Sequence, residues 1–274
     1  MKNERYSRQS FLGDSSQETI ESAIVGVVGL GGGGSHIVQQ LAHIGFKNFE
    51  LFDADTVDPE GSNLNRLIGA KTTDAKRQSR KMDIAKKMIL GLQPDAKIGE
   101  HFCTWQEAAS ALKRCHIVFG CVDSFLGRDQ LEQFTRRYLI AYVDIGMEVV
   151  MGSDKQPVMG GQVIASLPGQ ACMRCMGLLT EELLLREAER YGAAGSRPQV
   201  VWPNGVLASS AVGIGVDLLT DWTKRISGPV FLEYDGNRGT VKNRSQQIRS
   251  IGCNHYLESH VGEHVFLPLG SQEA

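Results

Sequence analysis

Residues 24–34 read IVGVVGLGGGG, and this stretch decides the fold of the chain. Its β-branched first part is typical of a strand buried in a parallel sheet, because both faces of such a strand meet apolar layers. The glycines then follow a G-x-G-x-x-G spacing, and apolar residues at helical spacing continue to Gly45, which predicts a helix that ends there. Residues 48–55 (NFELFDAD) predict a second strand that ends in acids. Together these segments predict a β-α-β unit.

Strand-like and helix-like segments keep alternating beyond this unit. Helices are predicted at 76–92 and 125–138, strands at 115–121 and 139–145, and one or two antiparallel strands at 147–166, turning at Gly160-Gly161. The alternation predicts an α/β fold, with a Rossmann-like, mostly parallel sheet, helices on both faces and antiparallel strands toward the C-terminus. The glycine-rich stretch 192–198 predicts a mobile loop.

Composition and charge exclude several classes of protein. Apolar residues make up 42% and charged residues 22% of the chain, which is typical of a globular protein. The net charge is −2, so no overall basic surface indicates nucleic acid or an anionic membrane as a partner. The longest apolar stretch, 206–222, contains Asp217 and Asp221 and predicts a buried helix rather than a membrane span. The polar start of the chain lacks a signal-peptide pattern and the six cysteines do not suggest a disulfide scaffold, so we expect a cytoplasmic protein.

The glycine loop predicts a nucleotide-binding site. Between a strand and a helix, missing Cβ atoms let the backbone approach a phosphate, and the helix N-terminus supplies N–H donors. A tight turn without a ligand is the simpler alternative. Asp53, at the end of the second strand, suits the ribose hydroxyls of either NAD or ATP. Asp55, Arg66 and the lysines that follow are not needed by a dehydrogenase but suit a triphosphate, which favours ATP.

Short motifs fall in a fixed order along most of the chain. They are RYSRQ at 5–9, the loop at 29–34, DAD at 53–55, SNLNR at 62–66, a lysine-led helix, CVD at 121–123 with Arg128, and the pair Cys172 and Cys175. In this order they resemble the ThiF/MoeB/HesA family, the bacterial relatives of ubiquitin-activating enzymes. The resemblance implies an ATP-dependent adenylyltransferase that activates the C-terminal carboxylate of a small ubiquitin-like or sulfur-carrier protein and releases pyrophosphate. It also implies a single domain over residues 1–274: an N-terminal arm (1–20), a nucleotide-binding core (21–150), and a region (151–274) with the antiparallel extension, crossover loop and C-terminal segment.

The resemblance assigns nucleotide-binding roles to individual residues. Those matched to the family's phosphate loop are Gly29, Gly31, Gly32 and Gly34, with Gly33 in place of a larger residue. Asp53 matches the ribose-binding acid, and Asp55 joins the same set. Asn63 and Arg66 match an asparagine and an arginine near the triphosphate, although two additional residues before Asn63 predict a displaced loop. Lys81 fits the phosphate lysine best, and Lys76 is the alternative.

Two further roles concern the metal and the assembly. Asp123 matches the acid associated with Mg²⁺ and the reacting phosphate, and one carboxylate with phosphate oxygens is a typical Mg²⁺ ligand set. An N-cap role for the following helix is compatible with it. Arg8 matches an arginine that reaches the ATP of a neighbouring subunit, which implies a homodimer; a disordered basic terminus is the alternative.

Cys172 and Cys175 have the spacing of a metal knuckle. Such a knuckle supplies two of the four Cys or His ligands that structural zinc takes. A redox pair is the alternative, but the thioredoxin-like context is missing. In the family a second C-x-x-C closes the site. Here Cys253 matches its first cysteine and Tyr256 stands at its second, so His255 or His260 would complete a Cys3His zinc site.

The segment that resembles the family's crossover loop, 190–204, contains no cysteine. The remaining Cys103, Cys115 and Cys121 are expected to be buried in or near the sheet. We therefore expect adenylation without a thioester on this loop. Adenylation of a short peptide, a non-catalytic nucleotide-binding subunit that recruits a protein, and an NAD-dependent oxidoreductase remain the alternatives.

Overall fold

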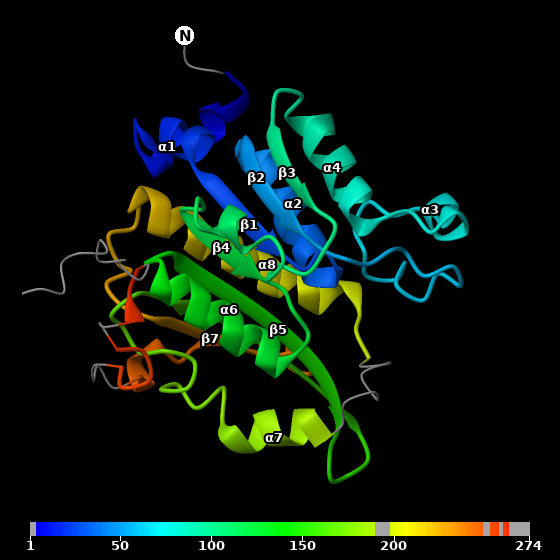
Figure 1. Ribbon diagram of the computed structural model, residues 1–274, viewed down its shortest axis with the longest axis vertical. Helices are drawn as coiled ribbons and strands as arrows, with labels where there is room; N and C mark the ends of the chain where they lie inside the picture. Colours follow the sequence, from blue (N-terminus) through cyan, green and yellow to red (C-terminus); the bar gives the residue numbers. More distant parts are fainter. Residues whose placement is uncertain (1–3, 190–197, 249–252, 258–259, 263–274) are drawn as a thin grey trace, which may run out of the picture.

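The computed structural model describes residues 4–189, 198–248, 253–257 and 260–262, which form one mixed sheet covered by helices (Figure 1). The sheet has eight strands in the order β3-β2-β1-β4-β5-β6-β7-β8. In chain order the strands are Ile24–Val28, Asn48–Phe52, Lys97–His101, Ile117–Gly120, Ala141–Met151, Pro157–Ser166, Val230–Asp235 and Thr240–Asn243. Strands β1 to β5 pair in parallel and β6 to β8 add antiparallel pairs. The predicted α/β fold is confirmed.

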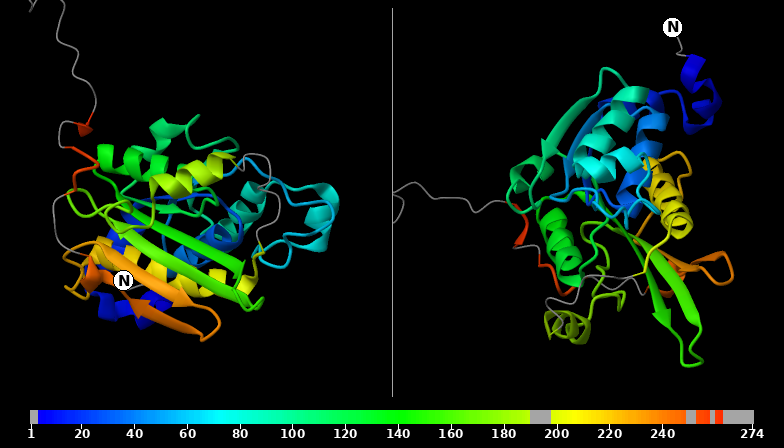
Figure 2. Two further views of the ribbon diagram at one scale, coloured as in Figure 1. Left: turned by 90° about the horizontal axis from the view of Figure 1, so that it is seen from below. Right: turned by 90° about the vertical axis from the view of Figure 1, so that its right-hand side faces the viewer.

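Helices cover both faces of the sheet (Figure 2). On one face lie α1 (Ser16–Ser22), α2 (Gly32–Ile44), α4 (Lys81–Leu92) and α8 (Val201–Thr220). On the other face lie α5 (Ala109–Leu112) and α6 (Phe125–Arg137), and α7 (Glu181–Glu189) packs against α6. The helix α3 (Thr72–Arg77) and the 3₁₀ helices η1 (Glu4–Leu12) and η2 (Ser245–Gln247) complete the described elements. Of the helices in the described part of the chain, none has the length and apolar character needed to cross a membrane.

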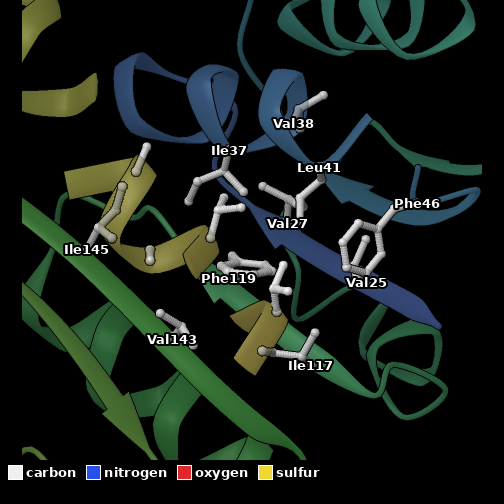
Figure 3. Close-up of a cluster of buried hydrophobic side chains, with 14 of the residues drawn as sticks. Val25, Val27, Ile37, Val38, Leu41, Phe46, Ile117, Phe119, Val143 and Ile145 are labelled. Carbon is white, nitrogen blue, oxygen red and sulfur yellow. The ribbon is translucent and has the colours of Figure 1, made fainter. Parts of the chain in front are cut away.

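The core explains why the first strand is apolar throughout. Val25 and Val27 of β1 pack with Leu41 of α2 and with Phe119 of β4 in one buried cluster (Figure 3). Val28 belongs to the cluster on the opposite face, under α6. Since each buried aliphatic side chain contributes roughly 1.5–3 kcal/mol, both faces of β1 stabilise its central position in the sheet.

Strands β5 and β6 form a long hairpin that extends past the body of the molecule (Figure 2). Their pairing runs out to Met151 and Pro157, so the chain turns at 152–156, and the predicted turn at Gly160-Gly161 is wrong. Both glycines lie inside β6. A Cβ at Gly161 would lie 2.7 Å from a methyl carbon of Leu207, so this glycine allows α8 to approach the sheet.

The helix predicted over 76–92 is divided into α3 and α4. Gln78 has a left-handed backbone with φ of 50°, which ends α3. The next residues join a neighbouring segment: the Ser79 carbonyl accepts from the Val57 N–H at 2.8 Å, and Arg80 forms a β-bridge with Thr56. The break makes Lys81 the first residue of α4. The predicted mobile loop, 192–198, lies outside the described residues except for its last position.

Two glycines differ sharply in the space around them. A Cβ at Gly34, in the first turn of α2, would overlap the carbonyl oxygen of Gly29 and lie 2.9 Å from its carbon. Both are backbone atoms of the strand-to-helix turn. Gly213, on the exposed side of α8, has nothing within 4 Å of an added Cβ.

We predict opposite effects for Gly34→Ala and Gly213→Ala on the free energy of unfolding. The first should destabilise the protein by about 1–3 kcal/mol or more, because the backbone must shift to accept a methyl group. The second should stabilise it by about 0.5–1 kcal/mol, because alanine loses less backbone entropy in a helix. Urea unfolding of both variants measures this difference, and equal stabilities would contradict the described turn.

Candidate functional site

A pocket of about 340 Å³ lies at the carboxyl ends of the parallel strands. Its walls come from the segments after β1, β2, β3 and β4, from β5 and from the start of α8. The predicted site residues that line it are Gly29, Gly31, Gly32, Asp53, Asp55, Arg66, Lys81 and Asp123. Since β2 and β4 lie on opposite sides of β1 in the sheet, the pocket lies at the topological switch point, where open α/β sheets bind ligands.

The glycine loop forms the floor of the pocket, and at Gly29 and Gly33 neighbouring atoms leave no room for a side chain. A Cβ at Gly29, whose φ is +88°, would lie 2.5 Å from the carbonyl oxygen of Cys121. A Cβ at Gly33 would collide with Ile145 of β5, which accounts for glycine where a larger residue is usual. Gly34 lies beneath the turn and does not line the pocket. The exposed backbone and the N-terminus of α2 together suit an anion.

Asp53 anchors the loop from the end of β2. Its Oδ2 accepts from the Leu30 N–H at 2.6 Å, and its Oδ1 accepts from the Asp55 N–H at 2.8 Å. Burial raises the pKa of the Asp53 carboxyl, while the Lys81 ammonium and these two N–H groups oppose the rise. The carboxylate therefore both orders the turn and faces the pocket.

Of the two candidate lysines, Lys81 enters the pocket and Lys76 does not. The Lys81 Nζ lies 2.6 Å from an oxygen of Asp55 and 3.9 Å from one of Asp53. Its backbone N–H also donates to the Asp55 carbonyl. Lys76 is exposed on α3. The break before α4 thus decides which lysine reaches the carboxylates.

The loop after β2 places its polar residues differently from the predicted arrangement. Asn63 does not line the pocket; its Oδ1 accepts from the Asp58 N–H at 3.3 Å. Asn65 instead donates to the Gln199 carbonyl at 3.2 Å. Arg66 lines the pocket, and its guanidinium donates to the Ser62 carbonyl at 3.2 Å. Asn63 therefore has its partner within this loop, at Asp58.

Asp123 follows β4 at the open side of the pocket and is exposed. Its Oδ1 accepts from the Gln199 side chain at 3.3 Å. The N-cap of α6 is the next residue, Ser124, whose Oγ accepts from the Gly127 N–H. The Glu187 carboxylate accepts from the N–H groups of Phe125 and Leu126, the first two residues of that helix, at 3.0 and 2.9 Å. The N-cap alternative for Asp123 is therefore not observed.

Arg128 is a pocket residue with a buried ion pair behind it. Its Nη1 lies 2.6 Å from Asp144 Oδ2, and the Tyr142 hydroxyl donates to the other oxygen of Asp144 at 2.8 Å. Because a buried charge without a partner costs several kcal/mol, Asp144 holds the guanidinium in place. Gly146 makes room for this guanidinium. In the sequence, only the family motif identified Arg128, and no pattern identified Asp144 as its partner.

Other pocket residues carried no signal in the sequence. They are Thr104, Trp105 and Gln106 after β3, Gln199 before α8, and Asn204 within α8. Cys103 and Cys121 also line the pocket and are half-buried, so the expectation that they are buried is wrong, whereas Cys115 is buried as expected. Thr104, Trp105 and Gln106 follow a strand, whereas Gln199 and Asn204 precede or begin α8, and only the tertiary fold brings them together.

Four side chains converge away from the pocket: Cys172, Cys175, Cys253 and His255. Their ligand atoms all lie within 4.8 Å of one another. Cys175 Sγ is 3.5 Å from Cys172 Sγ, 3.8 Å from Cys253 Sγ and 3.4 Å from His255 Nδ1. Burial raises the pKa of Cys253, but hydrogen bonds with the N–H groups of Tyr256 and His255 and with the Cys172 and Cys175 side chains together lower the pKa below its ordinary value. Of the two candidate histidines, the one brought to the cysteines is His255.

Arg8 lies on η1 and is exposed. Among the described residues that line the pocket, Arg8 is not present.

Comparison with known sequences gives one family and several relatives. The model of the ThiF family matches residues 5–255. The molybdopterin-synthase adenylyltransferase of Escherichia coli (strain K12) is 28% identical over 257 residues, which cover 91% of this chain and 94% of that protein. The sulfur carrier protein ThiS adenylyltransferase of the same strain is 28% identical over 180 residues, covering 63% of this chain and 66% of that protein. The ubiquitin-like modifier-activating enzyme 5 of Dictyostelium discoideum is 27% identical, and the match spans 58% of this chain and only 42% of that enzyme.

Solved structures of E. coli MccB share the fold. The MccB complex with ATP superposes with a TM-score of 0.69 at 18% identity, covering 88% of this chain and 71% of that chain. The complex with AMPCPP and MccA gives a TM-score of 0.70 at 18% identity, covering 89% and 71%. At such identities the likeness establishes the architecture alone.

Proposed function

The chain belongs to the ThiF family, and from this membership we propose that it is an ATP-dependent adenylyltransferase. Its substrate would be the C-terminal carboxylate of a small ubiquitin-like or sulfur-carrier protein. The products would be an acyl-adenylate and pyrophosphate. Two E. coli relatives are named for adenylyltransferase activity, one of them toward a sulfur carrier protein.

One observation carries the proposal: a glycine loop suited to an anion, two cationic side chains and two carboxylates converge in one pocket. The glycine loop, Lys81 and Arg66 supply positive potential, and Asp53 and Asp123 supply carboxylates at opposite sides. Such a set suits adenylation. The substrate carboxylate is already nucleophilic at neutral pH and needs no base to activate it. The protein has only to align the reactants and neutralise charge on the departing pyrophosphate.

The residues divide this work by position. Asp53 would accept from the ribose hydroxyls, and the N–H groups at the start of α2 would face phosphate oxygens. Lys81 would exchange its contact with Asp55 for a phosphate, and Arg66 would meet the triphosphate from the other side. Asp123 would hold Mg²⁺, which when bound supplies charge neutralisation at the phosphates. Attack of the substrate carboxylate on the α-phosphorus then breaks the bond to pyrophosphate.

The alternatives explain less of the pocket. An NAD-dependent oxidoreductase would use the glycine loop and Asp53 but has no need of Lys81 beside two acids. A non-catalytic subunit would not need an exposed Asp123 at the mouth. A short peptide in place of the carrier protein remains the second candidate substrate, since the pocket chemistry is the same for any C-terminal carboxylate.

Two features of the assembly belong to the proposal. We propose that Arg8 acts on the nucleotide of a neighbouring subunit in a homodimer, because it is exposed and does not line its own pocket. We also propose that residues 1–274 act as one domain, with the 1–20 arm serving that contact. Since the sequence of 190–204 has no cysteine, the acyl-adenylate would form without a thioester on this segment.

We propose that Cys172, Cys175, Cys253 and His255 hold a structural zinc ion. Zinc–ligand distances of about 2.3 Å to sulfur and 2.0–2.1 Å to nitrogen place tetrahedral sulfurs about 3.8 Å apart and sulfur and nitrogen about 3.5 Å apart. The separations of 3.5, 3.8 and 3.4 Å around Cys175 fit this geometry. Four protein ligands leave no open position, so the metal would stabilise the fold rather than take part in the reaction.

We predict that ATP with Mg²⁺ binds and that NAD does not, and that Lys81→Met weakens ATP binding by roughly 10–100-fold, the worth of a charge-assisted hydrogen bond. Lys76→Met is the matched control, because Lys76 is exposed and outside the pocket. Isothermal titration calorimetry measures both variants. Tight NAD binding without ATP binding, or equal losses in the two variants, would contradict the assignment.

We predict ATP–pyrophosphate exchange in the presence of a carrier protein with a free Gly-Gly C-terminus. Asp123→Ala should slow exchange by roughly 10²–10³-fold at saturating Mg²⁺, as removal of an electrostatic group from a reaction site does. A short peptide with the same C-terminal residues, tested in parallel, distinguishes the two substrate classes. Exchange at the wild-type rate in the variant would exclude Asp123 from the reaction.

We predict about one zinc per chain by elemental analysis, with loss of the metal in Cys172→Ser and His255→Ala. Cys103→Ser and His260→Ala are the controls and should keep it, since neither residue belongs to the four-residue cluster. Chelation should lower the melting temperature before it affects ATP binding by the folded fraction, because metal binding is coupled to folding. Metal-free protein from a preparation without chelators would refute the zinc site.

A further inference from the structure

Asn204 is a buried amide in the first turn of α8 whose side chain lies against the glycine loop. The residue is 5% exposed and lines the pocket. A Cβ at Gly32 would lie 2.6 Å from its Nδ2, and one at Gly33 would lie 3.7 Å from its Oδ1. The same point at Gly32 is 3.4 Å from the Cδ of Arg66. Asn204 therefore stands where the glycine loop and the pocket arginine meet.

The same amide connects the loop to the segment that precedes α8. Its Nδ2 donates to the Val200 carbonyl at 3.0 Å. One residue earlier, the Gln199 carbonyl accepts from Asn65 at 3.2 Å and the Gln199 side chain donates to Asp123 at 3.3 Å. Residues 199–204 thus touch the glycine loop, the loop after β2 and the acid after β4, which are the three segments that would surround a triphosphate.

We propose that Asn204 is a positioning residue that fixes the glycine loop for the phosphates of ATP. Glycines have the largest backbone entropy to lose, so a loop made of them binds an anion well only when neighbouring groups hold its shape. The Asn204 amide packs beside Gly32 and Gly33 from the side of α8, and Ile145 of β5 packs beside Gly33. The proposal rests on the proposed function only in naming ATP as the ligand. It assigns Asn204 an effect on phosphate binding and none on the ribose and base.

The test compares ATP–Mg²⁺ with adenosine, which lacks the phosphates, by calorimetry on the full chain. Asn204→Ala should weaken ATP binding about tenfold, the scale of one neutral hydrogen bond, and leave adenosine affinity unchanged. Asn204→Asp, of the same shape, should weaken ATP binding further, because its charge faces the phosphates, and added salt should reduce that loss. Ser209→Ala, at an exposed position of the same helix, is the control and should bind both ligands as the wild type does.

Each outcome decides the proposal. Equal losses for ATP and adenosine would mean that Asn204 only maintains the fold of the pocket, and unchanged ATP binding would mean that the loop holds its shape without it; either result overturns the proposal. If Asn204→Ala does not fold, the isosteric Asn204→Asp variant decides alone: a loss confined to ATP supports the proposal, and an equal loss for adenosine overturns it. A wild-type chain that binds adenosine but not ATP would overturn the proposed function itself, and is distinguishable because it appears before any substitution is made.

Discussion

The absence of side chains at the turn between β1 and α2 is the constraint on which the rest of the structure depends. The carbonyl of Cys121, directly after β4, lies so close to Gly29 that no Cβ fits, and the carbonyl of Gly29 fills the space beside Gly34. This close approach sets the distance between β1 and β4, the two strands at which the chain order diverges. The pocket opens at this point because helices connected to the two strands leave on opposite faces. The exposed backbone of the glycine loop and the position of the pocket in the sheet are therefore consequences of the same packing.

The helix α6 links the pocket to the cysteine and histidine cluster. Its first turns follow Asp123 and carry Arg128, which lines the pocket. Later turns carry Asp129, paired with Arg174 at 2.8 Å, and Glu132, which accepts from the Met173 N–H at 2.9 Å. Both acids also accept from Tyr256, at 3.4 Å each. Tyr256, which stands where the family resemblance expects a cysteine, thus fastens this segment to α6, while His255 lies beside the cysteines.

Polar contacts across the pocket come from segments that are distant in sequence. Asp53 orders both the glycine loop and the DAD turn, and the same turn receives Lys81 from α4. On the other side, Gln199 joins the loop after β2 to Asp123. The pocket is closed by hydrogen bonds between loops rather than by one rigid element. Its shape consequently depends on where each helix begins, which the residues before α4 and α8 decide.

The sequence by itself determined the β1-α2-β2 unit, the alternation of β4, α6 and β5, the glycine loop, the acid after β2 and the spacing of Cys172 and Cys175, because each depends on local spacing or on an ordered motif. It could not decide between Lys76 and Lys81 or between His255 and His260. It also misplaced the β5–β6 turn, because glycines that admit a neighbouring helix look the same in sequence as glycines that form a turn. Arg128 with Asp144, and Asn204 against Gly32, were invisible as pairs. Only the tertiary structure decided them, since partners far apart in the chain meet through strand register and helix packing, which no local pattern records.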